Sequence, residues 1–221
     1  MRIVFVRHGE PNYRLDALTE LGHLQAREVA ERVRYEGISE IYSSPMGRAR
    51  ETASYTSEIL DLPVTVLDFM HEIGWNSKNG EPLPHGGHPW TIPQVMVNGG
   101  RDVYDPEWRL GEYYINNDVT DKTAFVEEKG DEWLASLGYE REGKYYRVTK
   151  DDTEKTIAVF SHGGSSTALI AHMLNIAFPA MCLILRPYFT AVTVIKIPND
   201  TGKLVLPTVE IMSDSRHASR K

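Results

Sequence analysis

The sequence predicts an α/β fold, a three-layer αβα sandwich with a mostly parallel central sheet and an inserted cap region. Short β-branched and aromatic runs alternate with longer segments whose apolar residues recur at helical spacing. Strands that alternate with helices favour a parallel sheet covered by helices on both faces. The cap is predicted from residues 73–121, where this alternation stops.

The regular elements follow one another from the N-terminus. Residues 3–6 form a continuous apolar run typical of a buried strand. The next helix is expected to begin after Thr19, which can cap it, and to stop by Gly37. Ser44 and Pro45 are expected to open another helix, because serine suits the cap and proline the first turn. Further strands are expected near residues 38–42, 62–67, 143–148, 156–160, 192–197 and 204–211, with further helices near residues 122–137 and after residue 166.

The stretch from residue 73 to residue 121 is rich in Gly, Pro, Asn and Trp. A long irregular stretch of this kind is usually either functional or disordered. Its aromatic residues favour an ordered insertion; they are Trp75, Trp90, Trp108, Tyr113 and Tyr114. We therefore expect one domain, residues 1–221, in which residues 73–121 cover the substrate.

Charge and cysteine content exclude some classes of function. The formal net charge is −7, so a general nucleic-acid binder, which normally has a basic face, is not expected. Cys182 is the only cysteine, so no disulfide can form within the chain. It lies in an apolar run and is interpreted as a small buried hydrophobic residue.

No membrane partner is expected from the sequence. The N-terminal apolar run is too short for the core of a signal peptide. Residues 168–185 are apolar, but His172, Asn175 and Pro179 interrupt them. A buried helix followed by a strand explains this stretch better than a membrane span does. We expect a soluble cytoplasmic protein.

Polar residues follow three of the expected strands. Arg7 and His8 follow the first strand, Arg48 lies in the helical turn after the second, and His162 follows a late strand. In open parallel sheets, ligands bind at the carboxyl ends of the strands. We therefore expect these four side chains to gather around one site.

Two arginines and two histidines in one site favour a phosphate ligand. The guanidinium group matches phosphate oxygens and stays charged, and a cluster of cations is costly without an anion. The segments at Ser44 and Gly163 also open helices, whose free N–H groups favour anions. Each residue alone is more often structural or solvent-exposed, but their shared position at strand ends makes that explanation hard to sustain. One histidine can attack phosphorus and the other can donate hydrogen bonds.

Four motifs, in this order along the chain, resemble those of the histidine phosphatase superfamily, whose fold is phosphoglycerate mutase-like. They are residues 6–10 (Val-Arg-His-Gly-Glu), residues 19–26, residues 43–53 and residues 161–164 (Ser-His-Gly-Gly). The resemblance implies that His8 is the nucleophile that becomes phosphohistidine. It also implies that Arg7, Arg48 and His162 bind the phosphate. The family's proton donor follows the third strand, and Glu72 occupies that place here.

Other candidate site residues are less specific. Arg14 stands where the mutases of the family carry Asn, and it either binds substrate or faces solvent. Gly163 belongs to the last motif and is a further candidate for substrate binding. His85 and His88 lie close in sequence, but no third ligand is near, and zinc sites normally have three or four. We expect no metal and no cofactor.

The resemblance implies a metal-independent phosphatase that hydrolyses a small phosphorylated metabolite. The alternative is a phosphoglycerate-mutase-type transfer, which must hold a second acidic group of the substrate. Lys78, Arg101 and Arg109 are the only basic residues in the insertion, and the mutase segment Glu-Arg-His-Tyr-Gly is absent. A non-catalytic phospho-ligand-binding module ranks lower, because it would be free to lose the nucleophile and the donor. The sequence specifies neither the substrate nor an oligomeric state.

Overall fold

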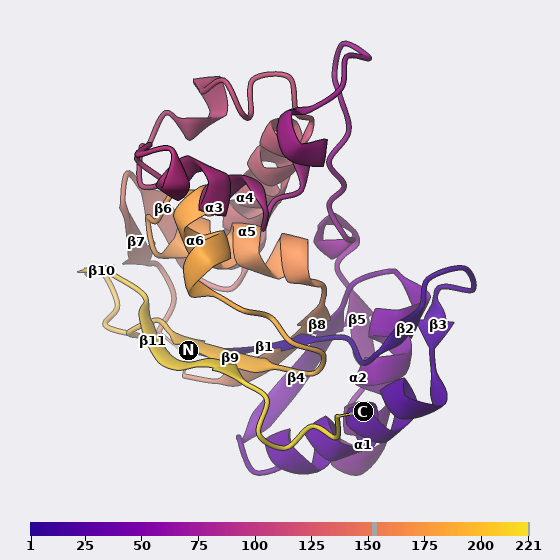
Figure 1. Ribbon diagram of the computed structural model, residues 1–221. Coiled ribbons are helices and arrows are strands. Elements are labelled where there is room, and N and C mark those ends of the chain that lie inside the picture. Colours follow the sequence, from indigo (N-terminus) through magenta and orange to yellow (C-terminus); the bar gives the residue numbers. More distant parts are fainter. Residues whose placement is uncertain (152–153, 221) are drawn as a thin grey trace.

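A computed structural model describes residues 1–151 and 154–220 (Figure 1). Its centre is a six-stranded sheet in the order β11-β9-β1-β8-β4-β5. Four strands are parallel, namely β1 (Arg2–Arg7), β8 (Thr156–Ser161), β4 (Ile38–Ser43) and β5 (Val64–Val66). The antiparallel edge consists of β9 (Val192–Lys196) and β11 (Thr208–Asp214). The expected α/β class with a mostly parallel sheet is confirmed.

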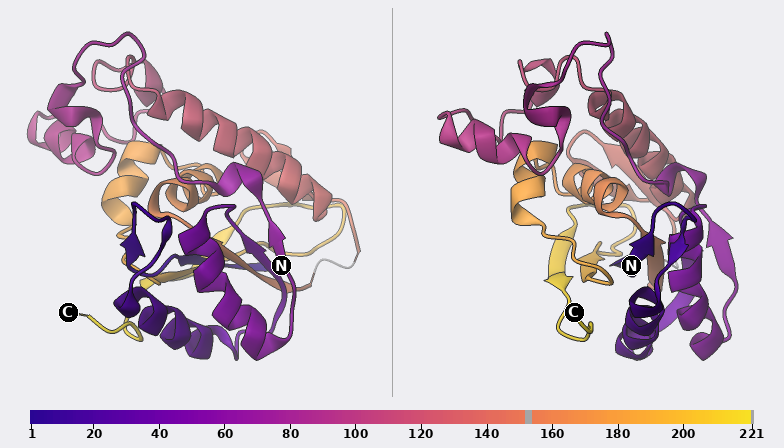
Figure 2. Two further views of the ribbon diagram at one scale, coloured as in Figure 1. Left: turned by 90° about the vertical axis from the view of Figure 1, so that its right-hand side faces the viewer. Right: turned by 45° about the vertical axis from the view of Figure 1, so that its right-hand side comes forward.

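Helices cover both faces of this sheet, as Figures 1 and 2 show. The helices α1 (Glu20–Val33) and α2 (Gly47–Leu60) pack together on one face. The other face carries α4 (Val119–Ser136), α5 (Gly163–Met173) and α6 (Phe178–Ile184). Strand β1 feeds both layers, because Val4 and Val6 belong to one hydrophobic cluster and Ile3 and Phe5 to the other. This is the period of two that a strand imposes on its side chains.

Helix α1 begins as expected, since the Thr19 hydroxyl accepts a hydrogen bond from the Gly22 N–H at 3.0 Å. The start expected for the next helix at Ser44 and Pro45 is wrong. Helix α2 begins at Gly47, and its cap residue contributes no side-chain bond. The Ser44 hydroxyl accepts the Met46 N–H at 3.3 Å, before the helix begins, and also pairs with a histidine of the site described below.

The insertion is folded but mostly irregular. It contains the 3₁₀ turns η2 (Pro84–Gly87) and η3 (Trp108–Leu110) and the short helix α3 (Ile92–Asn98), and η1 (Asp68–Met70) precedes it. Trp108 is buried and its ring centroid lies 4.8 Å from that of Tyr114 and 5.6 Å from that of Phe178. These contacts anchor the insertion on α6, above the helical layer (Figure 1).

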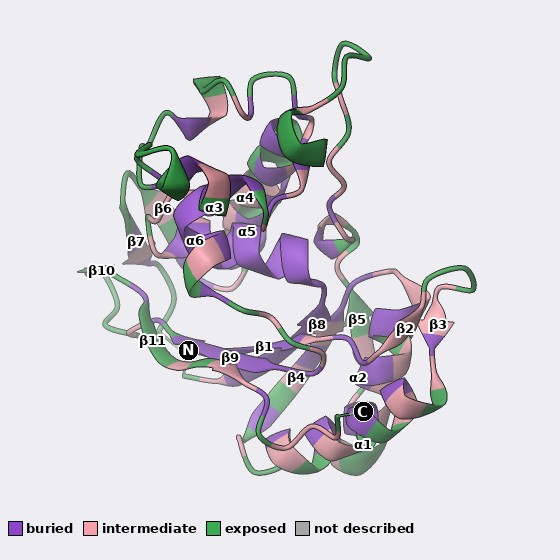
Figure 3. Ribbon diagram, viewed as in Figure 1, coloured by how far each residue is buried: buried purple, intermediate pink, exposed green. Residues whose placement is uncertain are grey.

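The strand expected near the end of residues 168–185 is wrong. A second helix, α6, stands there, because Asn175 adopts a left-handed φ of 55° that ends the first helix, and Pro179 lies in the opening turn of the second. Both helices are largely buried (Figure 3). Within the described ranges, no single helix has the length and apolarity to cross a membrane; α5 and α6 meet that test only as a pair, bent by 115°.

The strand expected at residues 204–211 is split in two. Residues Leu204–Val205 form β10, which joins β7 (Tyr145–Val148) and β6 (Tyr139–Glu142) in a three-stranded sheet. Residues 208–214 instead join the main sheet as β11. Pro207 lies between them, and proline has no N–H for a continuous ladder. A two-stranded ribbon, β2 (Pro11–Asn12) and β3 (Ala17–Leu18), follows β1.

Candidate active site

The carboxyl ends of β1, β4 and β8 bring the expected cluster together. His8 and His162 follow neighbouring parallel strands, and their ring centroids are 5.1 Å apart. Arg48, from the first turn of α2, donates from Nε to His8 Nε2 at 3.3 Å. All three side chains are buried. Three segments that are distant in sequence therefore meet at one edge of the sheet.

The partners of His8 indicate which ring nitrogen carries the proton. Nδ1 lies 2.7 Å from the Gly9 carbonyl oxygen, which can only accept, so Nδ1 is the N–H. Nε2 accepts from Arg48 and therefore holds the lone pair. Burial, together with the charges of Arg7 and Arg48, lowers the pKa of His8 to about 3. The ring is therefore neutral at pH 7, with a nucleophilic Nε2.

His162, the second histidine of the site, is held by Ser44. The Ser44 hydroxyl lies 2.7 Å from its Nε2, and its Nδ1 is buried with no hydrogen-bond partner among the described residues. Burial, followed by the neighbouring His8, lowers the pKa of His162. With the hydroxyl donating to Nε2, Nδ1–H is a donor without an acceptor. A phosphoryl oxygen is an acceptor of the kind it lacks.

Asp16 orients Arg48 and was not found in the sequence motifs. Its carboxylate pairs with Arg48 Nη1 and also accepts the Gly47 N–H at 2.7 Å. Asp16 lies in the turn between β2 and β3, at a φ of 50° that Asp tolerates better than most residues. The ion pair directs the remaining edge of the guanidinium, with Nε, toward His8. Nothing in the local sequence distinguishes this Asp from a turn residue.

Arg7 is fixed by a segment far away in sequence. Its Nη1 donates to the Pro187 carbonyl, and its guanidinium carbon lies 4.5 Å from the Phe189 ring centroid. Its Nε has no partner among the described residues. One donor of the guanidinium is therefore still available for an anion.

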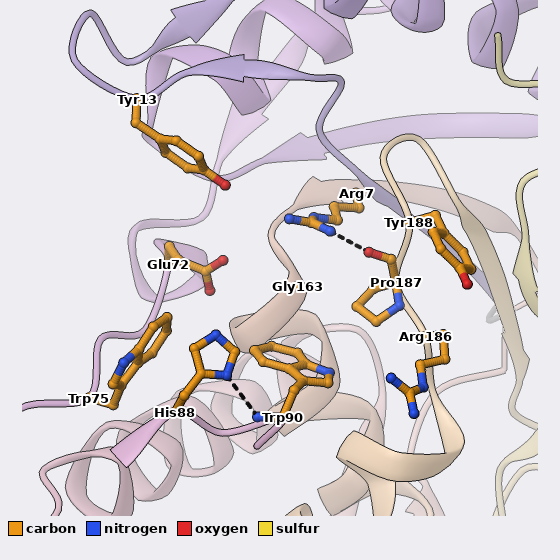
Figure 4. A pocket seen from close by; sticks show the side chains of 10 residues that line it. All are labelled: Arg7, Tyr13, Glu72, Trp75, His88, Trp90, Gly163, Arg186, Pro187 and Tyr188. Atoms are coloured by element: carbon orange, nitrogen blue, oxygen red, sulfur yellow. Dashed lines mark hydrogen bonds between the residues drawn. The ribbon is translucent and has the colours of Figure 1, made fainter. Parts of the chain in front are cut away.

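Glu72 lies across the pocket from Arg7 (Figure 4). Its Oε1 accepts the N–H groups of Ile73 and Gly164, each at 3.0 Å. A Cβ on Gly164 would stand 2.5 Å from Oε1, so only glycine permits this approach. Burial raises the pKa of the Glu72 carboxyl, although Arg7 opposes the shift. Oε2 has no hydrogen-bond partner among the described residues and can carry a proton, as a general acid requires.

Arg7 and Glu72 border a pocket with a volume of about 360 Å³. Its lining is Arg7, Tyr13, Glu72, Trp75, His88, Trp90, Gly163, Arg186, Pro187 and Tyr188 (Figure 4). His8 and His162 are at most 1% exposed, so a phosphoryl group must reach them past Arg7 and Glu72. Sequence reasoning singled out neither His88 as a wall residue nor Arg186, since neither belongs to a motif.

The remaining candidates lie as follows. Gly163 lines the pocket at the start of α5, whereas Arg14 is exposed in the turn between β2 and β3 and does not line it. His88 lies on the wall, with its ring centroid 4.6 Å from that of Trp75, and His85 lies against Tyr113. Within residues 1–151 and 154–220, no group of three or more His, Cys, Asp or Glu side chains could hold a metal. Independence from metal stays a prediction.

Residues 3–87 match the family model of the histidine phosphatase superfamily (branch 1). "Probable phosphoglycerate mutase GpmB" of Yersinia pestis (strain Pestoides F) is 30% identical over 119 residues, which cover 48% of this chain and 54% of that protein. The chain thus spans about half the length of the curated relatives it matches. The resemblance identified from the four motifs is confirmed.

Solved structures share the fold over nearly the whole chain. A phosphoserine phosphatase from Entamoeba histolytica, in complex with 3-phosphoglyceric acid, is similar with a TM-score of 0.64 and 23% identity, covering 99% of both chains. A mycobacterial glucosyl-3-phosphoglycerate phosphatase is similar with a TM-score of 0.65 and 22% identity, covering 97% of this chain and 99% of the other. The alpha-ribazole phosphatase of Shigella flexneri is similar with a TM-score of 0.62 and 18% identity, covering 97% and 96%. At these identities the likeness shows the fold alone.

Proposed function

We propose that this chain is an enzyme of the histidine phosphatase superfamily and that it hydrolyses a small phosphate monoester through phosphohistidine at His8. The observation that carries the proposal is the position of the buried His8 ring between the Gly9 carbonyl and Arg48. Its Nδ1–H is directed at the Gly9 carbonyl, its Nε2 lone pair faces Arg48, and burial keeps it neutral. An unprotonated imidazole beside a guanidinium is suited to attack a phosphoryl group that the guanidinium binds.

In the first step, an oxygen of the bound phosphoryl group replaces His8 Nε2 as the acceptor of the Arg48 N–H, and the freed Nε2 lone pair attacks phosphorus in line with the leaving oxygen. The N–P bond forms as the P–O bond to the leaving group breaks, and Glu72 gives its proton to the departing alkoxide. The guanidinium groups of Arg7 and Arg48 stabilise the charge on the equatorial oxygens, and the His162 Nδ1–H can donate to one of them. The alcohol product then leaves the pocket.

In the second step, water attacks the phosphohistidine. Glu72, now a carboxylate, removes a proton from that water, and the N–P bond breaks to release inorganic phosphate. His8 returns to its neutral state and Glu72 to its acid form. Both steps use the same groups, and the positive charge of the arginines supplies the stabilisation that a metal ion would give.

We also propose that residues 73–121 cover the substrate. Trp75, His88 and Trp90 come from this insertion and line the pocket, which supports the proposal. The names of the similar structures refer to three different compounds, namely phosphoserine, glucosyl-3-phosphoglycerate and alpha-ribazole. The names therefore indicate no particular compound for this chain.

The mutase alternative receives less support from the charges of the insertion. Each of its three basic residues is paired with a carboxylate: Lys78 with Asp121 at 2.7 Å, Arg101 with Glu112 at 2.8 Å and Arg109 with Glu127 at 2.6 Å. None of the three lines the pocket. Release of inorganic phosphate from a monoester, with no phosphorylated isomer formed, would distinguish hydrolysis from transfer.

Trapping the intermediate tests the proposal directly. Enzyme mixed with a phosphate monoester and quenched in alkali should carry one phosphoryl group, which is lost in acid as a phosphoramidate is. His8→Ala should abolish both the trapped group and turnover. His23→Ala is the matched control, because His23 lies on α1 against Tyr55 and outside the pocket. A His8→Ala variant with full activity would refute the proposed nucleophile.

A further inference from the structure

We propose that the substrate carries a carboxylate at its far end and that Arg186 binds it. This inference rests on the proposed phosphatase activity and adds the class of substrate. Arg186 lies between α6 and β9, outside the insertion, and lines the same pocket as Arg7 and Glu72. It supplies a second cation to the pocket, which the basic residues of the insertion do not.

The charge of Arg186 has no partner among the described residues. Its side chain makes no ion pair and no hydrogen bond there, and it is exposed. The basic residues of the insertion are all paired, as shown above. An unpaired guanidinium on the wall of a substrate pocket, in a chain with a net charge of −7, is a place for an anion to bind.

The position of Arg186 relative to Arg7 sets the order of the groups in the substrate. Pro187, the next residue, accepts the hydrogen bond from Arg7 Nη1. The two guanidinium groups therefore belong to one continuous wall. Figure 4 shows Arg186 on the same side of the pocket as Trp90, with Glu72 on the opposite side. A phosphoryl group bound near Arg7 leaves the rest of the molecule to extend toward Arg186.

A second donor without an acceptor lies at this end of the pocket. Trp90 Nε1 is buried with no hydrogen-bond partner among the described residues, and Figure 4 shows it on the side facing Arg186. A carboxylate oxygen is an acceptor of the kind that this N–H lacks. Buried polar groups without partners are rare, so a ligand that satisfies this one is favoured.

The number of free cations favours a carboxylate over a second phosphate. One guanidinium matches one carboxylate in a bidentate pair. A phosphate dianion would leave one negative charge without compensation at this end, and the Glu72 side of the pocket adds none. The pocket volume of about 360 Å³ is at the small end for ligand sites, so the substrate is a small metabolite.

Two pairs of phosphate monoesters test the proposal. The pairs differ in length, because the distance from the bound phosphoryl group to Arg186 decides which of them fits. The short pair is 3-phosphoglycerate and glycerol 3-phosphate, which differ only by a carboxylate in place of a hydroxymethyl group. The long pair is the phosphate ester of 3-(4-hydroxyphenyl)propanoate and that of its primary amide. The wild-type kcat/KM should favour the acid in at least one pair by about tenfold to a hundredfold, the range of a charge-assisted hydrogen bond.

Arg186→Gln should reduce this preference to near unity, chiefly by raising KM for the acid, while leaving the neutral member within about threefold. Arg101→Gln, an exposed arginine outside the pocket, should keep the preference. The inference is overturned if the wild type prefers neither acid, or if Arg186→Gln slows both members of a pair equally. Nitrophenyl phosphate tests the phosphatase activity separately from the role of Arg186. It carries no carboxylate, so its His8-dependent hydrolysis should occur whether or not Arg186 binds one.

Discussion

Replacing Glu72 by Gln should remove the general acid and leave the pocket intact. Glu72 Oε1 accepts both backbone N–H groups, from Ile73 and Gly164, at 3.0 Å. The carbonyl oxygen of Gln can accept both bonds in the same way. The substitution therefore exchanges only Oε2, the oxygen that carries the transferable proton, for an amide that cannot release one.

The size of the effect depends on the leaving group. An alkoxide is a strong base and needs the proton as the P–O bond breaks, so an alkyl phosphate should lose about 10²- to 10⁴-fold in the phosphorylation step. This is about 3 to 5 kcal/mol of transition-state stabilisation. Nitrophenolate is a stabilised anion and should lose less than about tenfold. Burial raises the pKa of Glu72, so the carboxyl should lose its proton only at pH values above the ordinary pKa range of Glu. The wild-type rate with the alkyl phosphate should fall as the pH rises through that point, and the rate of Glu72→Gln should show no such fall.

Single-turnover measurements with both substrates check this prediction, since they isolate phosphorylation from the second step, in which Glu72 acts as a base. Glu81→Gln is the matched control, because Glu81 is an exposed glutamate of the insertion that does not line the pocket. It should retain wild-type rates with both substrates. Equal losses with alkyl and nitrophenyl phosphate in Glu72→Gln would refute the acid role and make Glu72 a structural residue.

Four further outcomes are expected. Asp16→Asn should free Arg48 and lower phosphorylation by about tenfold to a hundredfold without unfolding the chain, as stopped-flow and melting curves would show; an unchanged rate would contradict the orienting role. Trp90→Ala should impair the natural substrate more than nitrophenyl phosphate, whereas Trp108→Ala, in the buried cluster, should cost about 3 to 5 kcal/mol of stability and affect both. Activity should survive exhaustive chelation and be inhibited by vanadate; recovery that required added zinc or magnesium would contradict metal independence. The pKa of His8 is lowered to about 3 in the folded state, so on acidification the unfolded state binds the His8 proton first. From pH 6.5 toward 3, the free energy of unfolding of the wild type should therefore fall by up to about 1.4 kcal/mol per pH unit more than that of His8→Asn. Urea titrations would measure both slopes, and equal slopes would contradict a buried neutral ring.

Local patterns in the sequence predict the layered architecture well. The apolar run of β1 and the same kind of run in β8 specify buried strands, since a residue at each position meets core on one face or the other. Arg7 is the last residue of β1, and His8 and His162 directly follow β1 and β8. The parallel arrangement then brings them together without any further information, because the carboxyl ends of parallel strands share one edge.

Other features depended on contacts that no local pattern encodes. Ser44 looks like a helix cap, but the tertiary structure pairs its hydroxyl with His162, and α2 begins later. Residues 204–211 read as one strand, but Leu204–Val205 pair with β7 and residues 208–214 pair with β9. In each case the local propensity favours one arrangement, and contacts with residues distant in sequence stabilise a different one.

The sequence by itself determined the mostly parallel sheet, most of its flanking helices and the four side chains that meet at its edge, Arg7, His8, Arg48 and His162. Only the tertiary structure decided that Asp16 orients Arg48 and that Arg186 shares a wall with Arg7. The physical reason is that a sequence motif specifies only the residues within a few positions of one strand end. The position of a side chain on another loop depends instead on how the whole chain packs, which spacing along the sequence does not contain.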